Sequence, residues 1–299
     1  MGKIAFVFSG QGDQYPGMGK DLYEKYPVAQ KIYDLCDGIR PDTSAQCFNG
    51  TEDELKETKN TQPCLFAMEL AAASVLMEKG IVPDAVAGFS LGEVVAATVS
   101  GTFGNETGFR LVCKRGELMQ REAEKFDTSM AAVVKLTPEQ VQSVCDKYAN
   151  VYPVNFNCPG QITVSGLSSQ MADFFADVKA AGGRAIPLKV KGAFHSPFMN
   201  EAANAFAEEL ANVEIKERTV PLYSNMTAEP YTKDVVELLS KQICNPVQWE
   251  KIIRNMIADG VDTFIEIGPG KTLTNMIKKI SADVKAVNIT EYLAEVEVC

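Results

Sequence analysis

The sequence predicts an α/β protein made of a large α/β-hydrolase-like domain with a parallel sheet and an inserted, smaller ferredoxin-like subdomain. Three observations support this prediction. A short apolar run at residues 3–8 is typical of a buried strand. Residues 84–89 form a second such run, which passes through a glycine-flanked turn directly into a helix-like segment, as in parallel α/β units. Residues 125–191 instead have the order strand, helix, strand, strand, helix, strand.

The large domain is expected to be discontinuous, comprising residues 1–124 and 192–299. In its first half, the strand at 3–8 ends at Gly10 and Gly12, and segment 61–79 is so uniformly apolar that we expect a helix through the core. A helix follows the second strand over residues 91–99. In its second half, helix and strand patterns return at 196–210, 221–224, 235–243, 248–259, 263–267, 271–280 and 285–289.

The small subdomain is expected to span residues 125–191. Strands are predicted at 130–136, 151–156, 162–165 and 185–190. Thr137 and Pro138 begin the first helix, with a capping residue followed by proline at the first helical position. The second helix covers residues 168–181 and ends at Gly182 and Gly183. Substrates usually bind in clefts between domains of this kind.

Length and composition exclude several classes of protein. The chain has 299 residues, 46% of them hydrophobic, which is enough for a large core. A net charge of −10 argues against nucleic acid as a partner. Eight cysteines without a CxxC pair, together with one histidine, argue against a zinc site and a disulfide framework and favour a reducing cytoplasm. The most apolar segment, 64–77, is too short to span a membrane.

The strongest chemical signal is the G-x-S-x-G sequence at residues 88–92, placed between a strand and a helix. In that context the serine hydroxyl of Ser90 is held out at the end of the sheet, and the next amide, that of Leu91, points toward a developing oxyanion. The alternative is an ordinary strand-to-helix turn with a capping serine.

His195 is the only histidine, so it must be the base if an imidazole activates Ser90. It precedes Ser196 and Pro197, which read as the cap and first residue of a helix. A helix N-terminus disfavours a nearby positive charge and would help to keep the imidazole neutral. The alternative is a structural histidine.

The chain resembles the malonyl-CoA:acyl carrier protein transacylases over nearly its whole length. Seven motifs recur in the order found in that family: Phe8 with 10–14, 88–93, 114–116, 154–161, 192–195, 245–249 and 268–270. The resemblance implies that Ser90 is the acylated nucleophile, that His195 is its general base, and that the amides of Gln11 and Leu91 form the oxyanion hole. It also implies that the carbonyl of Gln248 orients His195 in place of the acid of a triad.

The resemblance further assigns residues to the acyl group. Arg115 would hold the free malonyl carboxylate, because a guanidinium binds a carboxylate through two hydrogen bonds; otherwise it is a surface arginine of a helix. Asn157 and Phe194 would also be substrate-binding, with the Phe194 ring leaving little room for an α-methyl branch. Phe89 departs from the family, which usually has histidine there, and this puts a polar role of that position in doubt.

The activity implied by the resemblance is transfer of a malonyl group from malonyl-CoA to the phosphopantetheine thiol of acyl carrier protein, which supplies fatty acid synthesis. The reaction would pass through a malonyl-serine and needs no metal or bound cofactor, since coenzyme A thioester is a substrate. We expect a cytoplasmic monomer whose partners are malonyl-CoA and acyl carrier protein, with no membrane or nucleic acid.

Three other readings remain. A serine thioesterase or hydrolase shares the G-x-S-x-G turn, but would normally show an acid between the nucleophile and the histidine. A catalytically silent module that docks carrier proteins should lack Ser90, His195 or Arg115, and none is missing. A trans-acting malonyl acyltransferase of a polyketide synthase has the same chemistry with a different carrier, and the sequence does not separate it from the first reading.

Overall fold

A five-stranded parallel sheet forms the centre of the large part of the molecule. The computed structural model describes residues 2–232 and 234–297. The strands are β1 (Lys3–Phe8), β2 (Ala85–Gly88), β7 (Leu222–Tyr223), β8 (Val261–Ile267) and β9 (Lys285–Asn288), in the order β7-β2-β1-β8-β9. Every neighbouring pair is parallel, as predicted. The sheet takes strands from both sides of residues 125–191, so the chain leaves the large part and returns to it.

Side chains of β1 alternate between two cores, which explains its unbroken apolar sequence. Phe6 and Phe8 belong to a cluster with the helices on one face of the sheet. Ala5 and Val7 belong to a second cluster on the other face, together with Trp249 and residues of two C-terminal helices. A strand buried on both faces cannot show the polar alternation of a half-exposed strand.

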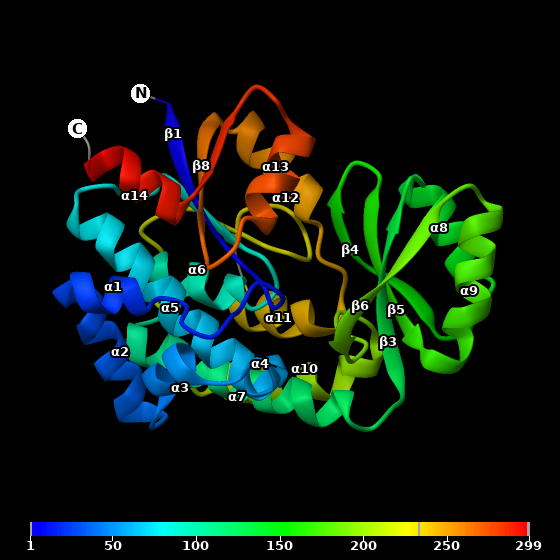
Figure 1. The fold of residues 1–299 in the computed structure, drawn as a ribbon, viewed down its shortest axis with the longest axis horizontal. Coiled ribbons are helices and arrows are strands. Elements are labelled where there is room, and N and C mark those ends of the chain that lie inside the picture. The colour runs from blue at the N-terminus through cyan, green and yellow to red at the C-terminus, as the bar shows by residue number, and fades with distance from the viewer. Residues whose placement is uncertain (1, 233, 298–299) are drawn as a thin grey trace.

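Helices cover both faces of this sheet (Figure 1). In the first half they are α1 (Lys20–Lys25), α2 (Pro27–Ile39), α3 (Thr43–Asn49), α4 (Glu52–Lys56), α5 (Thr58–Glu78), α6 (Gly92–Val99) and α7 (Asn105–Ala123). In the second half they are α10 (Asn200–Ala211), α11 (Val235–Lys241), α12 (Trp249–Ala258), α13 (Thr272–Ile280) and α14 (Ile289–Glu297), with short 3₁₀ helices η1 (Pro197–Met199) and η2 (Gln242–Cys244). Most residues of α5 are buried, which confirms the predicted core helix.

The small part, drawn in green in Figure 1, is an antiparallel sheet with two helices on one side. Its strands β3 (Thr128–Val134), β4 (Val151–Cys158), β5 (Gln161–Leu167) and β6 (Arg184–Lys191) lie in the order β4-β5-β3-β6. Helices α8 (Pro138–Cys145) and α9 (Ser168–Ala180) follow β3 and β5. The chain order of these elements is the predicted one, and Thr137 forms a capping box with Gln140.

Backbone hydrogen bonds join the small sheet to the large part. Val247, in the loop before α12, donates to the carbonyl of Val154 at 2.9 Å and accepts from the amide of Phe156 at 2.8 Å. Asn155 and Val247 thus form a parallel bridge at the free edge of β4, and the segment before α12 lies alongside the small sheet.

Two segments of the second half illustrate where the structure differs from the sequence-based expectation. Residues 289–297 form α14, for which no helix is predicted, and the segment after His195 begins with the 3₁₀ turn η1 before α10. None of the helices in residues 2–232 and 234–297 is long and apolar enough to cross a membrane.

Candidate active site

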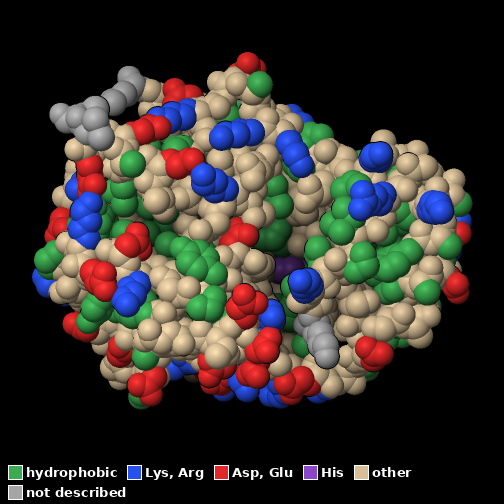
Figure 2. Space-filling view, viewed as in Figure 1, with side chains coloured by type: hydrophobic (Ala, Val, Ile, Leu, Met, Phe, Trp, Pro, Cys, Tyr) green, Lys and Arg blue, Asp and Glu red, His purple; other side chains and the backbone are tan. Residues whose placement is uncertain are grey.

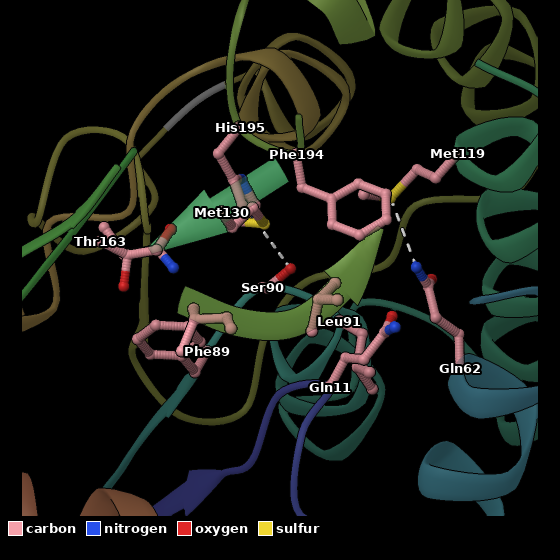
Figure 3. Close-up of a pocket in the computed structure, with 13 residues that line it drawn as sticks. Gln11, Gln62, Phe89, Ser90, Leu91, Met119, Met130, Thr163, Phe194 and His195 are labelled. Atoms are coloured by element: carbon pink, nitrogen blue, oxygen red, sulfur yellow. Dashed lines mark hydrogen bonds between the residues drawn. The ribbon is translucent and has the colours of Figure 1, made fainter. Parts of the chain in front are cut away.

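A cavity lies between the large and small parts, and the histidine is visible at the bottom of the hollow between them in Figure 2. The close-up in Figure 3 shows the side chains around it. The cavity is lined mainly by apolar side chains, with a few polar groups among them. The lining residues are Gln11, Gln62, Phe89, Ser90, Leu91, Met119, Met130, Asn155, Thr163, Leu188, Val190, Phe194 and His195.

Ser90 occupies a tight turn between β2 and α6 and has left-handed backbone geometry, with φ of 55°. The glycines on either side make this turn possible. A Cβ on Gly88 would lie 1.9 Å from backbone atoms of Gly92, and a Cβ on Gly92 would lie 2.4 Å from the carbonyl oxygen of Phe8. The strained turn holds the hydroxyl of Ser90 out from the end of the sheet, as the G-x-S-x-G pattern predicts.

Two amide side chains hold the strained backbone of Ser90. The Oδ1 of Asn225 accepts from the Ser90 amide at 2.8 Å, and its Nδ2 donates to the Gly88 carbonyl at 2.5 Å. The Nε2 of Gln242 donates to the Ser90 carbonyl at 2.6 Å. These contacts satisfy buried polar groups and offset the conformational cost of the positive φ.

The imidazole of His195 contacts the hydroxyl of Ser90 directly. Its Nε2 lies 2.8 Å from Ser90 Oγ, and its Nδ1 lies 2.8 Å from the main-chain carbonyl oxygen of Gln242. A carbonyl only accepts, so Nδ1 carries the proton and Nε2 presents its lone pair to the hydroxyl. The two residues predicted to act together therefore meet, although 105 positions separate them in the chain.

The carbonyl that holds His195 belongs to Gln242 and not to Gln248, so that part of the prediction is wrong. Gln248 directly precedes α12, and its carbonyl oxygen accepts from the amide of Ile252 at 3.0 Å in the first helical turn. Gln242 instead begins η2, which packs against the segment that carries His195.

Burial sets the protonation state of His195. The side chain is almost fully buried, and burial lowers its pKa to about 4, with a further lowering from the charge of Arg115. The imidazole is therefore neutral, and able to accept a proton, throughout the physiological pH range.

Arg115, on α7, is fully buried behind the cavity. Its Nη2 donates to Gln242 Oε1 at 2.8 Å and lies 3.3 Å from Ser90 Oγ, while its Nη1 donates to Gln62 Oε1 at 2.8 Å. Burial lowers its pKa to about 10, so the guanidinium stays charged at neutral pH. The alternative of a surface arginine is excluded, since the side chain is fully buried and reaches the Ser90 hydroxyl.

The predicted oxyanion-hole residues, Gln11 and Leu91, both line the cavity beside Ser90 (Figure 3). In the described part of the chain, neither main-chain amide donates to another protein group. Leu91 is the residue before the first turn of α6, where the helix dipole favours negative charge. Both amides are therefore free to bind an anionic oxygen.

Of the two residues predicted to bind the substrate beside Arg115, Asn157 lies in the small part and Phe194 lies just after it. Phe194 lines the cavity, whereas Asn157 does not. Asn157 is buried and its Nδ2 donates to Thr163 Oγ1 at 3.1 Å, so it supports a lining residue from behind. Asn155 lines the cavity in its place, because the pairing of β4 with β5 is irregular on both sides of that residue.

Phe89 packs against Trp249 with ring centroids 5.5 Å apart and an interplanar angle of 65°. It also lines the cavity. This position is therefore an apolar wall, and the polar role that a histidine would have there is absent.

Besides Asn155 and Thr163, which line the cavity, sequence reasoning missed further polar residues of the site, among them Gln62, Glu93, Asn225 and Gln242. Glu93 Oε1 accepts from the amide of Asn225 at 3.0 Å and from the hydroxyl of Tyr231 at 2.7 Å, which anchors Asn225. The sequence did offer one indication of Asn225, since it follows β7 at the carboxyl edge of the parallel sheet, where binding residues gather.

No group of three or more His, Cys, Asp or Glu in residues 2–232 and 234–297 is arranged to hold a metal ion.

The fold and site together define an acyl transferase. A model of the family described as "Acyl transferase domain" matches residues 5–294. Because this match covers almost the whole chain, the chain belongs to that family.

Relatives within this family share a more particular name. The malonyl CoA-acyl carrier protein transacylase of Bacillus subtilis is 40% identical over 97% of this chain and 94% of its own. The crystal structure of the Clostridium perfringens transacylase of that name superposes with a TM-score of 0.94 at 36% identity, over 99% of this chain and 98% of that one. A malonyl-transacylase in complex with its type II PKS acyl-carrier protein superposes with a TM-score of 0.95 at 32% identity, over 99% and 100% of the chains.

We predict that the imidazole of His195 remains neutral down to a pH of about 4. Because the chain contains one histidine, its Cε1–H resonance in an NMR titration reports this group without ambiguity in a protein free of added histidines. The urea-unfolded chain should titrate near the ordinary value of about 6.5. Arg115→Ala removes a nearby positive charge and should raise the folded-state midpoint. A wild-type midpoint near that of the unfolded chain would contradict the buried, neutral base.

Proposed function

We propose that this protein transfers the malonyl group of malonyl-CoA to the phosphopantetheine thiol of acyl carrier protein and so supplies fatty acid synthesis. The proposal rests on one observation, that two functional side chains lie within hydrogen-bond distance of the Ser90 hydroxyl. The Ser90 hydroxyl lies 2.8 Å from the His195 imidazole and 3.3 Å from the Arg115 guanidinium. A nucleophile and a neutral base in the cavity, with a buried cation directly behind it, suit an acyl group that carries a carboxylate.

In the first half-reaction, Ser90 Oγ attacks the thioester carbonyl carbon of malonyl-CoA while His195 Nε2 takes the hydroxyl proton. The amides of Gln11 and Leu91 bind the negative oxygen of the tetrahedral intermediate. The C–S bond then breaks, and the coenzyme A sulfur leaves with the proton from His195. The product is a malonyl ester of Ser90, and the imidazole is neutral again.

The second half-reaction reverses these steps with a different thiol. His195 Nε2 takes the proton of the carrier-protein thiol, the sulfur attacks the ester carbonyl, and Ser90 leaves with that proton. The Gln242 carbonyl stabilises the imidazolium in both halves, because it accepts from Nδ1–H and takes no proton itself. This arrangement replaces the carboxylate of a triad with a neutral carbonyl.

Arg115 is the proposed selector of the acyl group. Its charge and paired N–H groups fit a free carboxylate, which a simple acyl group lacks. Phe194, Met119 and Met130 form apolar walls around the same space. Phe194 is proposed to limit bulk next to the thioester and so to disfavour an α-methyl branch.

The remaining assignments follow from the same proposal. The large part, residues 1–124 and 192–299, is assigned as a hydrolase-like domain, and residues 125–191 as a ferredoxin-like subdomain, a class that the strand order of the small sheet supports. The enzyme is proposed to be a cytoplasmic monomer that needs no cofactor beyond its coenzyme A substrate.

A polyketide carrier protein is the second candidate partner. The observation that favours it is the similarity to a malonyl-transacylase whose structure is titled as a complex with a type II PKS acyl-carrier protein. The chemistry at Ser90 is the same for both carriers. Parallel assays with the fatty acid carrier protein and a polyketide carrier protein of the same host would distinguish them by their kcat/KM values.

We predict that Ser90→Ala abolishes formation of a covalent malonyl adduct. Without the Oγ atom, no ester can form, and intact mass after incubation with malonyl-CoA should equal that of the untreated variant. The wild-type protein should gain one malonyl group and keep it until a thiol acceptor is added. A malonyl adduct on the variant would refute the nucleophile, and rapid hydrolysis of malonyl-CoA by the wild type would favour a thioesterase.

Arg115→Ala should shift the preference from malonyl toward acetyl groups. Loss of a charge-assisted contact to a carboxylate costs about 1.5–3 kcal/mol, so the malonyl-to-acetyl ratio of acylation rate constants should fall by roughly one to two orders of magnitude. Quenched acylation of the enzyme by malonyl-CoA and by acetyl-CoA, followed by intact mass, gives the ratio. An unchanged ratio would remove Arg115 from the proposed selection.

A further inference from the structure

The guanidinium of Arg115 is held by two neutral amide oxygens. Gln62 Oε1 accepts from Nη1 and Gln242 Oε1 accepts from Nη2, each at 2.8 Å. No carboxylate lies within ion-pair distance of this guanidinium in residues 2–232 and 234–297. This is unusual for a fully buried arginine, since buried charges are normally paired.

The one carboxylate in the same network is engaged elsewhere. Glu93 is buried, but its Oε1 accepts from Asn225 and Tyr231 and makes no contact with Arg115. Burial raises the pKa of Glu93 to about 7, so its carboxylate is only partly ionised at neutral pH. The charge of Arg115 is therefore oriented by its neighbours without being neutralised by contact.

Gln62 is placed so that its oxygen must face Arg115. It lies in the first part of α5 and lines the cavity. Its Nε2 donates to Met119 Sδ at 3.3 Å, the contact drawn in Figure 3, and this fixes which end of the amide faces which neighbour. Gln62 contacts neither Ser90 nor His195 among the hydrogen bonds of the described residues, unlike Gln242.

The Arg115 guanidinium has N–H groups that Gln62 and Gln242 do not use. A guanidinium has two N–H groups on each η nitrogen. On Nη1, one N–H is used by Gln62 and one has no protein acceptor in the described chain. On Nη2, one is used by Gln242 and the other faces Ser90 Oγ, which becomes a weaker acceptor than a hydroxyl once it is part of an ester. One N–H on each η nitrogen is thus available to a carboxylate.

We propose that Gln62 is a specificity-determining positioning residue, whose neutral amide aims Arg115 into the cavity while leaving its charge for the carboxylate of the acyl group. This inference rests on the proposed malonyl transfer. A carboxylate at position 62 would contact the same nitrogen, neutralise the guanidinium and compete with the substrate. Glutamine supplies the hydrogen bond without the charge.

The test is Gln62→Glu, which changes one amide nitrogen to oxygen at nearly constant size. Acylation rate constants with malonyl-CoA and with acetyl-CoA are measured separately by quenched intact mass. We expect the malonyl rate constant to fall about ten- to a hundredfold, while the acetyl rate constant stays within about threefold of wild type. Gln62→Met, which removes the acceptor without adding charge, should lower the malonyl rate constant by less than Gln62→Glu does.

Gln46→Glu is the matched control. Gln46 Oε1 accepts from Arg40 Nη2 at 2.7 Å outside the cavity, so this variant makes the same chemical change at another glutamine–arginine contact. The malonyl-to-acetyl ratio should not change. The inference is overturned if Gln62→Glu lowers both rate constants equally, as a merely structural role would, or if it changes neither. Failure of the wild-type protein to form any malonyl adduct would instead refute the proposed function.

Discussion

The hydrogen bond between Ser90 Oγ and His195 Nε2 is the contact on which the proposed chemistry depends, and Gln242 holds both of its ends. The main-chain carbonyl of Gln242 orients His195 through Nδ1, and its side-chain Nε2 holds the carbonyl of Ser90. Its Oε1 also accepts from Arg115. One glutamine, located at the junction of α11 and η2, therefore links the nucleophile, the base and the proposed acyl selector in a single hydrogen-bonded unit.

Burial gives this unit its electrostatic character. Exclusion from water keeps His195 neutral, and the nearby positive charge of Arg115 acts in the same direction. A carboxylate in contact with His195 would oppose both effects and would also attract Arg115. A carbonyl partner avoids that conflict, which is a physical reason for an amide network in a site meant to receive a negatively charged acyl group.

A site residue could be predicted from the sequence when it lies in a short motif or is the only residue of its type. Ser90 lies in a turn whose glycines are required by contacts of 1.9 and 2.4 Å that any Cβ would make. His195 is the only histidine. The parallel sheet was also predictable, as was the order of strands and helices along the chain in the small part. Buried strands and capped helices have patterns that can be recognised within a short stretch of sequence. Helix α14 also has such a signal, which the sequence analysis overlooked: Asn288 caps its first turn by accepting from the amide of Thr290 at 2.9 Å.

The rest required the folded chain. A main-chain carbonyl is chemically identical at every residue, so no side-chain pattern distinguishes Gln242 from Gln248 as the partner of His195. The choice between Asn155 and Asn157 depended on irregular pairing in β4, which breaks simple alternation. Gln62 and Asn225 act through contacts with residues 53 and 135 positions away, which no local pattern encodes.

The most direct measurement is a crystal structure of the protein after incubation with malonyl-CoA. The account predicts continuous density from Ser90 Oγ to a malonyl group whose carboxylate lies within about 3 Å of Nη1 and Nη2 of Arg115. His195 should still contact the Gln242 carbonyl. An adduct on a different residue, or a malonyl carboxylate directed away from Arg115 into solvent, would contradict it.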